Sequence, residues 1–262
     1  MNKGISFYWG YKEISPEERA KLMSNLGYDC VITNADKKFK SQNGSIKYQV
    51  KLFKKYNLKL SSLHMKYNSE DLPFFWESGF RGYKLYKSLL NDVRIAKKYG
   101  FTCVVVHLKG KPSSVGLNRI KKVLKLCNRL QVPLAIENLS KQYCLEYVFE
   151  NIDDKYLKFC YDIGHNNCFE PEYDYLSKYG DKLICLHLHD NKGEKDDHTL
   201  NKYGTIDWAK FANKLKEINY TGNLDYEVLM CYKEGDAAED VAKIVLEQAQ
   251  QLENMINGWF MY

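Results

Sequence analysis

The sequence predicts a single (β/α)8 barrel, and three observations lead to this prediction. Short apolar runs rich in β-forming residues alternate eight times with longer amphipathic stretches over 262 residues. The runs are almost continuously apolar, as parallel strands buried on both faces are. No Pro/Gly-rich linker or low-complexity segment divides the chain, so residues 1–262 are expected to form one domain. Eight β-then-α units in a chain of about 250 residues favour a closed barrel over an open doubly wound sheet.

The predicted strands are enriched in Val, Ile, Tyr and Phe. They cover residues 5–10, 28–33, 58–65, 101–108, 132–138, 157–164, 182–190 and 223–229. The first strand is followed by Tyr11, Lys12 and Glu13, whereas an open dinucleotide-binding sheet would place a glycine-rich phosphate loop there. The closed barrel is therefore the preferred architecture.

Helix signals fill the stretches between the strands. Ser15 followed by Pro16 and Glu18 predicts a helix start with a capping box, and Gly27 predicts its end. Further apolar stripes predict helices over 83–99, near 120–127, over 208–218 after an N-cap at Asp207, and over about 237–256.

Composition narrows the class of protein. A hydrophobic share of 45% supports a sizeable core and argues against disorder. No apolar stretch approaches the length of about 18 residues that a membrane span needs, and the first residues do not look like a signal peptide. A cytoplasmic protein is expected. The net charge of +6 is too small and dispersed to indicate nucleic-acid binding by itself, but it is compatible with a phosphorylated substrate.

The cysteines follow no CxxC or other regular spacing, which favours free buried thiols over a disulfide framework. They are expected to be structural. Their positions are Cys30, Cys103, Cys127, Cys144, Cys160, Cys168, Cys185 and Cys231.

Polar residues gather at the predicted carboxyl ends of the strands, where barrels of this kind place their sites. All six histidines belong to this set, which comprises His64, His107, Glu137, Asp162, His165, His187, His189, Asp190, Asp196, His198 and Glu227. A lone histidine beside an apolar run is usually a satisfied core residue, but converging imidazoles and carboxylates stay unsatisfied without a cation. The set therefore predicts a divalent metal. Nitrogen and oxygen ligands suit Zn²⁺, Mn²⁺, Fe²⁺, Co²⁺ or Mg²⁺.

Several segments resemble the xylose isomerase-like barrels, a family of sugar and sugar-phosphate isomerases and epimerases that also includes the endonuclease IV group. The stretch LHLHDNKGEKDDHTLNKYGTIDW (186–208) is similar to the family's H-x-H-D-N-x-G-x-x-D-x-H run followed by G-x-I-D-W. IENLS (136–140), YDIGH (161–165) and DYEV (225–228) resemble its other segments. The resemblance covers nearly the whole chain, and it is specific for the superfamily rather than for one reaction.

The epimerase pattern implies that one divalent ion is held by Glu137, Asp162, His187 and Glu227. Glu137 and Glu227 would be the catalytic pair, one removing a proton beside the substrate carbonyl and the other returning one, through an enediolate held on the metal. His165 would contact substrate oxygens. A buried salt bridge is the alternative role for the two glutamates.

The endonuclease-like pattern adds further residues, all of them present. They are His64, His107, His165, Asp196 and His198. This resemblance implies up to three zinc ions and cleavage of a phosphodiester in abasic DNA. His189 and Asp190 are expected to orient ligands through hydrogen bonds. His189, because it alternates with His187, is expected to point away from the barrel centre.

Two loops and four lysines bear on the choice of substrate. The loop after the second strand carries Lys37, Lys38 and Lys40, and the loop over 66–82 carries Phe74, Phe75 and Trp76. DNA contact is conceivable for both loops, but packing over a small sugar is the commoner role. Some lysines near strand ends could hold a phosphate, although solvation is commoner; they are Lys66, Lys109, Lys141 and Lys192. A small sugar or sugar phosphate is therefore the expected partner, nucleic acid is disfavoured, and association of copies of the chain stays open.

Overall fold

Eight parallel strands form the centre of the molecule. They are β1 (Lys3–Ser6), β2 (Cys30–Asn34), β3 (Lys59–His64), β4 (Cys103–Val106), β5 (Leu134–Glu137), β6 (Leu157–Asp162), β7 (Leu183–His187) and β8 (Leu224–Tyr226). The computed structural model describes residues 1–10, 13–35, 40–66, 68–228 and 237–259. Within them the strands are ordered β7-β6-β5-β4-β3-β2-β1-β8, and the neighbours in this order are parallel.

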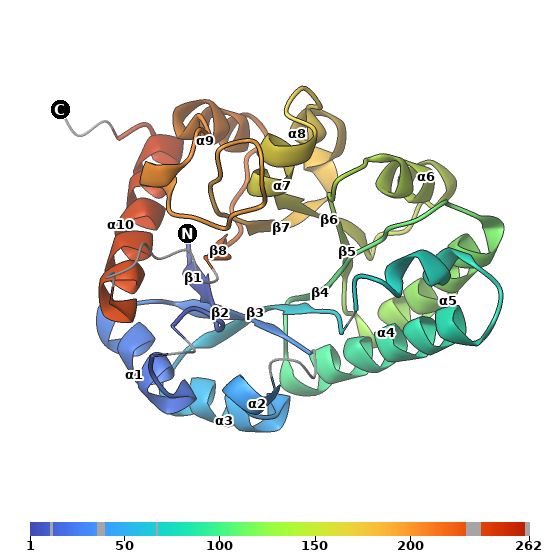
Figure 1. Ribbon diagram of the computed structural model, residues 1–262, viewed down its shortest axis with the longest axis horizontal. Helices are drawn as coiled ribbons and strands as arrows, with labels where there is room; N and C mark the ends of the chain where they lie inside the picture. Colours follow the sequence, from blue (N-terminus) through green and yellow to red (C-terminus); the bar gives the residue numbers. More distant parts are fainter. Residues whose placement is uncertain (11–12, 36–39, 67, 229–236, 260–262) are drawn as a thin grey trace.

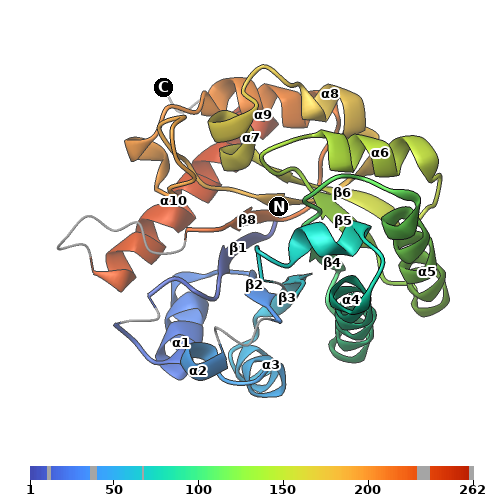
Figure 2. The same ribbon diagram turned by 45° about the vertical axis from the view of Figure 1, so that its right-hand side comes forward.

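Helices surround the strands, as Figure 1 and the turned view in Figure 2 show. The α-helices are α1 (Pro16–Leu26), α2 (Lys40–Asn43), α3 (Ile46–Lys55), α4 (Phe80–Tyr99), α5 (Ser114–Leu130), α6 (Tyr143–Asn151), α7 (Ile163–Phe169), α8 (Tyr175–Tyr179), α9 (Trp208–Glu217) and α10 (Ala238–Asn257). Short 3-10 turns are η1 (Leu72–Trp76), η2 (Gly180–Lys182) and η3 (Asn201–Tyr203). Helix α10 packs against both α9 and α1, so the last helix meets the first.

The barrel is closed by a short parallel contact between the last two strands. Leu188, one residue beyond β7, bridges to Tyr226 on β8. The Leu188 amide donates to the Asp225 carbonyl at 2.9 Å, and the Glu227 amide donates to the Leu188 carbonyl at 2.9 Å. The predicted (β/α)8 barrel is thus confirmed, with a closing contact shorter than the other strand pairings.

The helix starts follow the predicted capping chemistry. The Ser15 hydroxyl accepts from the Glu18 amide at 3.3 Å, and the Glu18 carboxylate accepts from the Ser15 amide at 2.9 Å. Gly27 ends α1 with φ of 97°, a left-handed conformation that favours glycine. Asp207 caps α9 by accepting from the Lys210 amide at 2.9 Å.

The first strand differs from its predicted range. Strand β1 covers Lys3–Ser6, whereas residues 5–10 were expected. Phe7 and Trp9 are fully buried yet lie in a turn, and the Trp9 indole donates to the Ala238 carbonyl at 2.8 Å. The apolar residues after Ser6 are apolar because they are buried, not because they belong to a strand. The predicted strand therefore extends beyond the observed end of β1. Leu229, the last residue of the eighth predicted strand, lies outside the described residues.

The cysteines match the prediction of free buried thiols. Among the described residues the cysteines are all free, and only Cys168 is not fully buried. Cys231 lies outside the described part of the chain. The same part of the chain contains no helix with the length and apolarity needed to cross a membrane.

Candidate metal and active site

The polar residues singled out in the sequence lie at the carboxyl ends of the strands. His64, Glu137, Asp162 and His187 are the last residues of β3, β5, β6 and β7. His107 and Glu227 each follow directly after β4 and β8. Asp162 is also the N-cap of α7, where its carboxylate accepts from the His165 amide at 2.7 Å. Parallel strands of a barrel end at one mouth, so the fold itself brings these side chains together.

Glu137 is the hub of the site. Its Oε2 lies 3.1 Å from His107 Nε2, 3.1 Å from His187 Nδ1 and 3.5 Å from His64 Nε2. Its other oxygen, Oε1, lies 3.2 Å from His165 Nδ1. The Glu137 side chain is only 1% exposed, so this carboxylate is surrounded by imidazoles and shielded from water.

A second glutamate reaches the same imidazole. Glu227 Oε2 lies 3.6 Å from His187 Nδ1, and the Glu227 side chain is 14% exposed. Asp162, His187 and Glu227 offer ligand atoms that all lie within 4.8 Å of one another. The structure therefore brings together the four residues expected to hold a single ion. We call Glu137, Asp162, His187 and Glu227 the central cluster.

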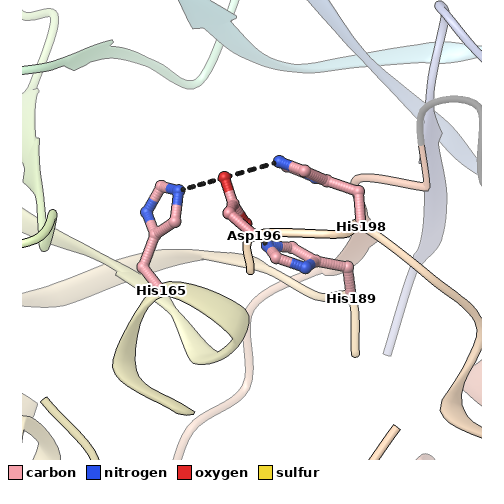
Figure 3. Close-up of side chains that lie close together, drawn as sticks. All are labelled: His165, His189, Asp196 and His198. Atoms are coloured by element: carbon pink, nitrogen blue, oxygen red, sulfur yellow. Dashed lines mark hydrogen bonds and ion pairs between the residues drawn. The ribbon is translucent and has the colours of Figure 1, made fainter. Parts of the chain in front are cut away.

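His165, His189, Asp196 and His198 form a second group of potential ligands, which we call the lateral cluster (Figure 3). Asp196 Oδ2 lies 3.2 Å from His165 Nε2 and 3.2 Å from His198 Nε2. The rings of His189 and His198 stack with their centroids 3.9 Å apart. His165 belongs to both regions, because its Nδ1 faces Glu137 and its Nε2 faces Asp196.

The direction expected for His189 is wrong. Its Nε2 lies 3.0 Å from Asp162 Oδ1 and 3.6 Å from Asp196 Oδ1, so the ring is turned into the site. Residues two apart along an extended chain project to the same side, and His189 therefore follows His187.

Glu137 also belongs to a third group of potential metal ligands. His64, His107 and Glu137 offer ligand atoms within 4.8 Å of one another. The two Nε2 atoms of His64 and His107 approach to 3.0 Å, and the rings meet edge to face. Glu137 Oε2 thus faces both this group and His187 of the central cluster.

The carboxylates of this site are held ionised. Burial raises the pKa of Glu137, but the charges of His107 and His187 and the hydrogen bonds to it outweigh burial and hold the pKa well below its ordinary range. Burial also raises the pKa of Asp162, and the charge of His165 helps to bring this pKa below its usual value. The negative charge is therefore retained inside the protein.

The imidazoles divide into two classes. Burial lowers the pKa of His187, but the charges of Glu227 and Glu137 raise it well above the ordinary value. In His107 burial prevails over Glu137, and the pKa of His107 falls below its ordinary value. Positive charge is thus favoured on His187, which faces both Glu137 and Glu227, and a cation beside these two carboxylates would meet the same electrostatic demand.

Unpartnered buried atoms test whether a metal ion fits these residues. Among the described residues, Glu137 Oε2, both ring nitrogens of His187 and Asp196 Oδ1 are buried and make no hydrogen bond of regular geometry, although Glu137 Oε2 and His187 Nδ1 face each other at 3.1 Å. Leaving such atoms unsatisfied is costly, and a divalent cation would satisfy carboxylate and imidazole donors together. The residues fit a metal ion.

Asp190 fixes the loop that carries part of the lateral cluster. Its backbone pairs with Thr199 through two hydrogen bonds of 2.9 Å, which close the loop over 191–198. Its Oδ1 accepts from the Asn191 amide at 2.8 Å and from the Thr205 amide at 3.0 Å. Among the described residues, the Asp190 side chain hydrogen-bonds to backbone amides and to the Trp208 indole, so it acts on the loop and not on the metal-donor atoms.

Two residues at this mouth were not singled out by the sequence analysis for a role there. Asn138 Nδ2 donates to the Asp162 carbonyl at 2.8 Å, and Asn138 Oδ1 accepts from the Asp162 amide at 2.8 Å. Cys160 lies close to Glu137 and His187. The signals were present, because Asn138 directly follows Glu137 and Cys160 precedes Asp162 by two residues on one strand.

Comparison with models of protein families identifies the family of this chain. The model described as xylose isomerase-like TIM barrel matches residues 20–248. The chain belongs to this family.

Relatives of this xylose isomerase-like barrel match only in part. An uncharacterized protein of Sinorhizobium fredii is 34% identical over 111 residues, which cover 40% of this chain and 36% of that protein. An uncharacterized protein of Methanocaldococcus jannaschii is 26% identical over 151 residues, covering 52% of this chain and 51% of that protein. The chain thus spans about half, or less, of the length of these relatives.

Solved structures of the same fold match along the whole chain. A D-tagatose 3-epimerase-like protein superposes with a TM-score of 0.76 at 19% identity, covering 98% of this chain and 99% of that chain. The D-psicose 3-epimerase of Clostridium cellulolyticum, solved with D-tagatose, gives a TM-score of 0.71 at 14% identity and covers 98% of this chain and 99% of that chain. At such identities the likeness establishes the fold.

Two loops of this xylose isomerase-like barrel were considered for DNA contact, and the structure describes the second of them more fully than the first. Lys37 and Lys38 lie outside the described residues, as does the side chain of Lys40. Phe75 and Trp76 are each only 2% exposed, and the Arg81 guanidinium lies 3.7 Å from the centroid of the Phe74 ring. These aromatic side chains pack onto the barrel. Of the four lysines considered for phosphate binding, Lys109, Lys141 and Lys192 are exposed, and Lys66 is half-buried.

Proposed function

We propose that this protein is a metal-dependent isomerase or epimerase of sugars or sugar phosphates. The observation that carries the proposal is the pair of carboxylates on one imidazole: Glu137 Oε2 at 3.1 Å and Glu227 Oε2 at 3.6 Å from His187 Nδ1. Glu137 ends β5 and Glu227 directly follows β8, so the two glutamates approach this point from different sides of the mouth. Two carboxylates in such an arrangement can remove a proton from a substrate carbon and return one to it.

The central cluster supplies the ligands for one divalent ion. When bound, such an ion would lower the energy of the negative charge that develops on substrate oxygens as a carbon-bound proton leaves. Glu137, Asp162, His187 and Glu227 would hold it.

Side chains of the protein would perform the proton transfers and orient the substrate. Glu227 is the more exposed of the two glutamates, so it meets a substrate that enters from the mouth. Glu137 is ionised, because its pKa is held low, and it can therefore accept a proton. His165 lies 3.2 Å from Glu137 Oε1 through Nδ1 and 3.2 Å from Asp196 Oδ2 through Nε2, and it would contact a substrate oxygen bound beside them. Asn138 holds the backbone of Asp162 through two hydrogen bonds and so fixes the carboxyl end of β6.

Proton exchange with solvent tests this function. The full chain with its native metal is incubated with ketoses and ketose phosphates in deuterated water, and deuterium incorporation is measured. Glu137→Gln and Glu227→Gln are each expected to abolish incorporation, because each removes one proton carrier. Glu146→Gln, a carboxylate on α6 paired with Lys178, is the matched control and should exchange normally. Substantial exchange in either site variant would contradict the two-base mechanism.

A second candidate function is metal-dependent phosphoester hydrolysis, and one observation favours it. Three donor groups meet at the mouth: the His64–His107–Glu137 group, the central cluster and the lateral cluster. Together they offer enough nitrogen and oxygen ligands for up to three zinc ions, which could activate water and bind a phosphodiester. The packing of Phe75 and Trp76 onto the barrel supports the smaller substrate instead.

Metal content separates the two functions. One ion per chain together with deuterium exchange supports the isomerase or epimerase. Three zinc ions per chain together with cleavage of abasic DNA would overturn it in favour of the hydrolase. Asp196→Asn provides an internal check, because it removes a lateral carboxylate but none of the four ligands of the central cluster, and it should lower the metal content only if the lateral cluster holds an ion.

A further inference from the structure

A buried thiol lies directly behind the central cluster. Cys160 and Asp162 are two residues apart on β6, so their side chains project to the same side of the strand. In the strand register Cys160 is paired with Glu137 on β5. Its Sγ, a carboxylate oxygen of Glu137 and a ring nitrogen of His187 all lie within 4.8 Å of one another, and the three side chains are buried. Three neighbouring strands therefore aim three potential ligands at one point.

A second observation marks this point as a ligand site. Within the described part of the chain, Glu137 Oε2 and both ring nitrogens of His187 make no hydrogen bond of regular geometry, and His187 Nδ1 meets Glu137 Oε2 only as an ion-pair contact at 3.1 Å. The exposed fractions of these two side chains are 1% and 0%, so water does not compensate them. A thiol is only a weak hydrogen-bond donor and cannot satisfy all of these atoms.

We propose that Cys160 is a sulfur ligand of the metal ion in the central cluster. The centre is then a mixed nitrogen, oxygen and sulfur site, and it selects Zn²⁺ or Co²⁺ over Mg²⁺ and Mn²⁺, because thiolate favours softer ions. On binding, the S–H bond breaks, the proton passes to solvent and sulfur bonds to the ion. The inference rests on the proposed metal centre, but it does not depend on which reaction that centre serves.

The neighbouring thiols supply a matched control. Cys103 Sγ lies 3.7 Å from Cys185 Sγ, and both belong to the same small buried cluster as Cys160. Among the described residues Cys103 belongs to none of the donor groups that could hold an ion. Cys103→Ser therefore changes a comparable buried thiol without removing a ligand.

Cobalt spectroscopy tests the proposal on the full chain after removal of metal. Addition of Co²⁺ to the unchanged protein is expected to produce visible d–d bands and a near-ultraviolet sulfur-to-cobalt charge-transfer band. Cys160→Ser should keep the d–d bands and lose the charge-transfer band, whereas Cys103→Ser should keep both. Loss of a residue that only orients a metal ligand commonly costs 10–100-fold in affinity, and loss of a ligand itself should cost at least tenfold. Cys160→Ser should therefore weaken Zn²⁺ binding by about tenfold or more and leave Mn²⁺ binding almost unchanged.

The other outcomes separate this proposal from the proposed function. Visible bands without charge transfer in the unchanged protein would overturn sulfur ligation and leave the metal centre standing. Charge transfer that survives in Cys160→Ser would assign the sulfur to another cysteine and also overturn the proposal. No cobalt binding would contradict the centre itself, and sulfur ligation with it.

X-ray absorption of the unchanged zinc-loaded protein decides the question even if Cys160→Ser does not fold. A sulfur shell at about 2.3 Å is expected. A shell of nitrogen and oxygen alone would refute the proposal.

Discussion

The carboxylate of Asp190 accepts a hydrogen bond from the indole of Trp208, with Oδ2 2.7 Å from Nε1. Its other oxygen accepts from backbone amides at Asn191, Thr205 and Ile206, at distances of 2.8 to 3.2 Å. One buried side chain thus joins the end of β7 to the start of α9, across the loop that carries Asp196 and His198.

Asp190→Asn is expected to lower the free energy of unfolding by about 2–3 kcal/mol, because the amide group turns a donor toward backbone donors. Trp208→Phe removes one donor only and should cost about 1 kcal/mol. Urea unfolding measures both. Asp181→Asn, at an exposed position paired with Lys182, is the control and should have little effect. Equal stability of Asp190→Asn and the unchanged protein would show that the carboxylate does not hold the loop.

Gly164 leaves space for the His189 ring. A Cβ at position 164 would lie 1.9 Å from His189 Cε1, so Gly164→Ala must displace the ring from Asp162. We expect a loss of about 1–3 kcal/mol in stability, as for other overpacked cores, together with weaker metal binding, because His189 lies 3.0 Å from the central ligand Asp162.

Gly180→Ala is a milder test of the same kind, because its Cβ would meet only the Ile218 side chain, at 2.9 Å. Calorimetry and a metal titration of both variants measure the difference. Unchanged metal binding in Gly164→Ala would show that the position of His189 is unimportant.

Asp225 makes stability depend on pH. It is buried inside the barrel, and burial raises its pKa to about 6 despite hydrogen bonds from Ser61 and Cys30. An unfolded aspartate has a pKa of about 3.9, so the folded protein binds the extra proton between these values. The contribution of Asp225 is therefore fully present below about pH 4 and is lost as the pH rises through about 6, a change of about 3 kcal/mol.

Asp225→Asn removes this dependence. Its free energy of unfolding relative to the unchanged protein should rise by about 3 kcal/mol between pH 4 and pH 7. The measurement is denaturant unfolding at several pH values after metal removal. Parallel pH profiles for the two proteins would contradict the prediction.

Ser15→Ala tests the capping box of α1. The substitution removes the acceptor of the Glu18 amide and should cost about 1 kcal/mol. The same change at Ser24, inside the helix, should cost nothing or stabilise slightly, because alanine has the higher helix propensity. Thermal unfolding distinguishes the two, and equal effects would exclude a specific role of the cap.

The barrel and the meeting of the site residues were predictable from the sequence because the two share one cause. Parallel strands place their carboxyl ends at one mouth, so residues as distant in the chain as His64 and Glu227 were expected to converge. Ser15 and Gly27 similarly marked the ends of α1 through local chemistry.

Other features depended on geometry that hydrophobic patterns do not encode. Trp9 is as buried in its turn as a strand residue would be, and the predicted boundary of the first strand failed for that reason. The direction of His189 was misjudged although the period of two was available. Cys160 was expected to be a structural buried thiol, and only the strand register with Glu137 reveals that it lies near the potential metal ligands. The distances among the imidazoles depend on side-chain packing, which no spacing rule supplies.

His165 presents one nitrogen to Glu137 and the other to Asp196. Burial lowers the pKa of His165, but the charge of Asp162 and the hydrogen bonds to Asp196 and Glu137 raise it well above its ordinary value. The ring is therefore an imidazolium, and its single positive charge is shared between the two carboxylates that its nitrogens face. Binding of an ion or ligand beside Asp196 therefore changes the electrostatic environment of Glu137 through this single ring, without movement of the backbone. The lateral cluster and the central cluster are thus electrostatically coupled through His165.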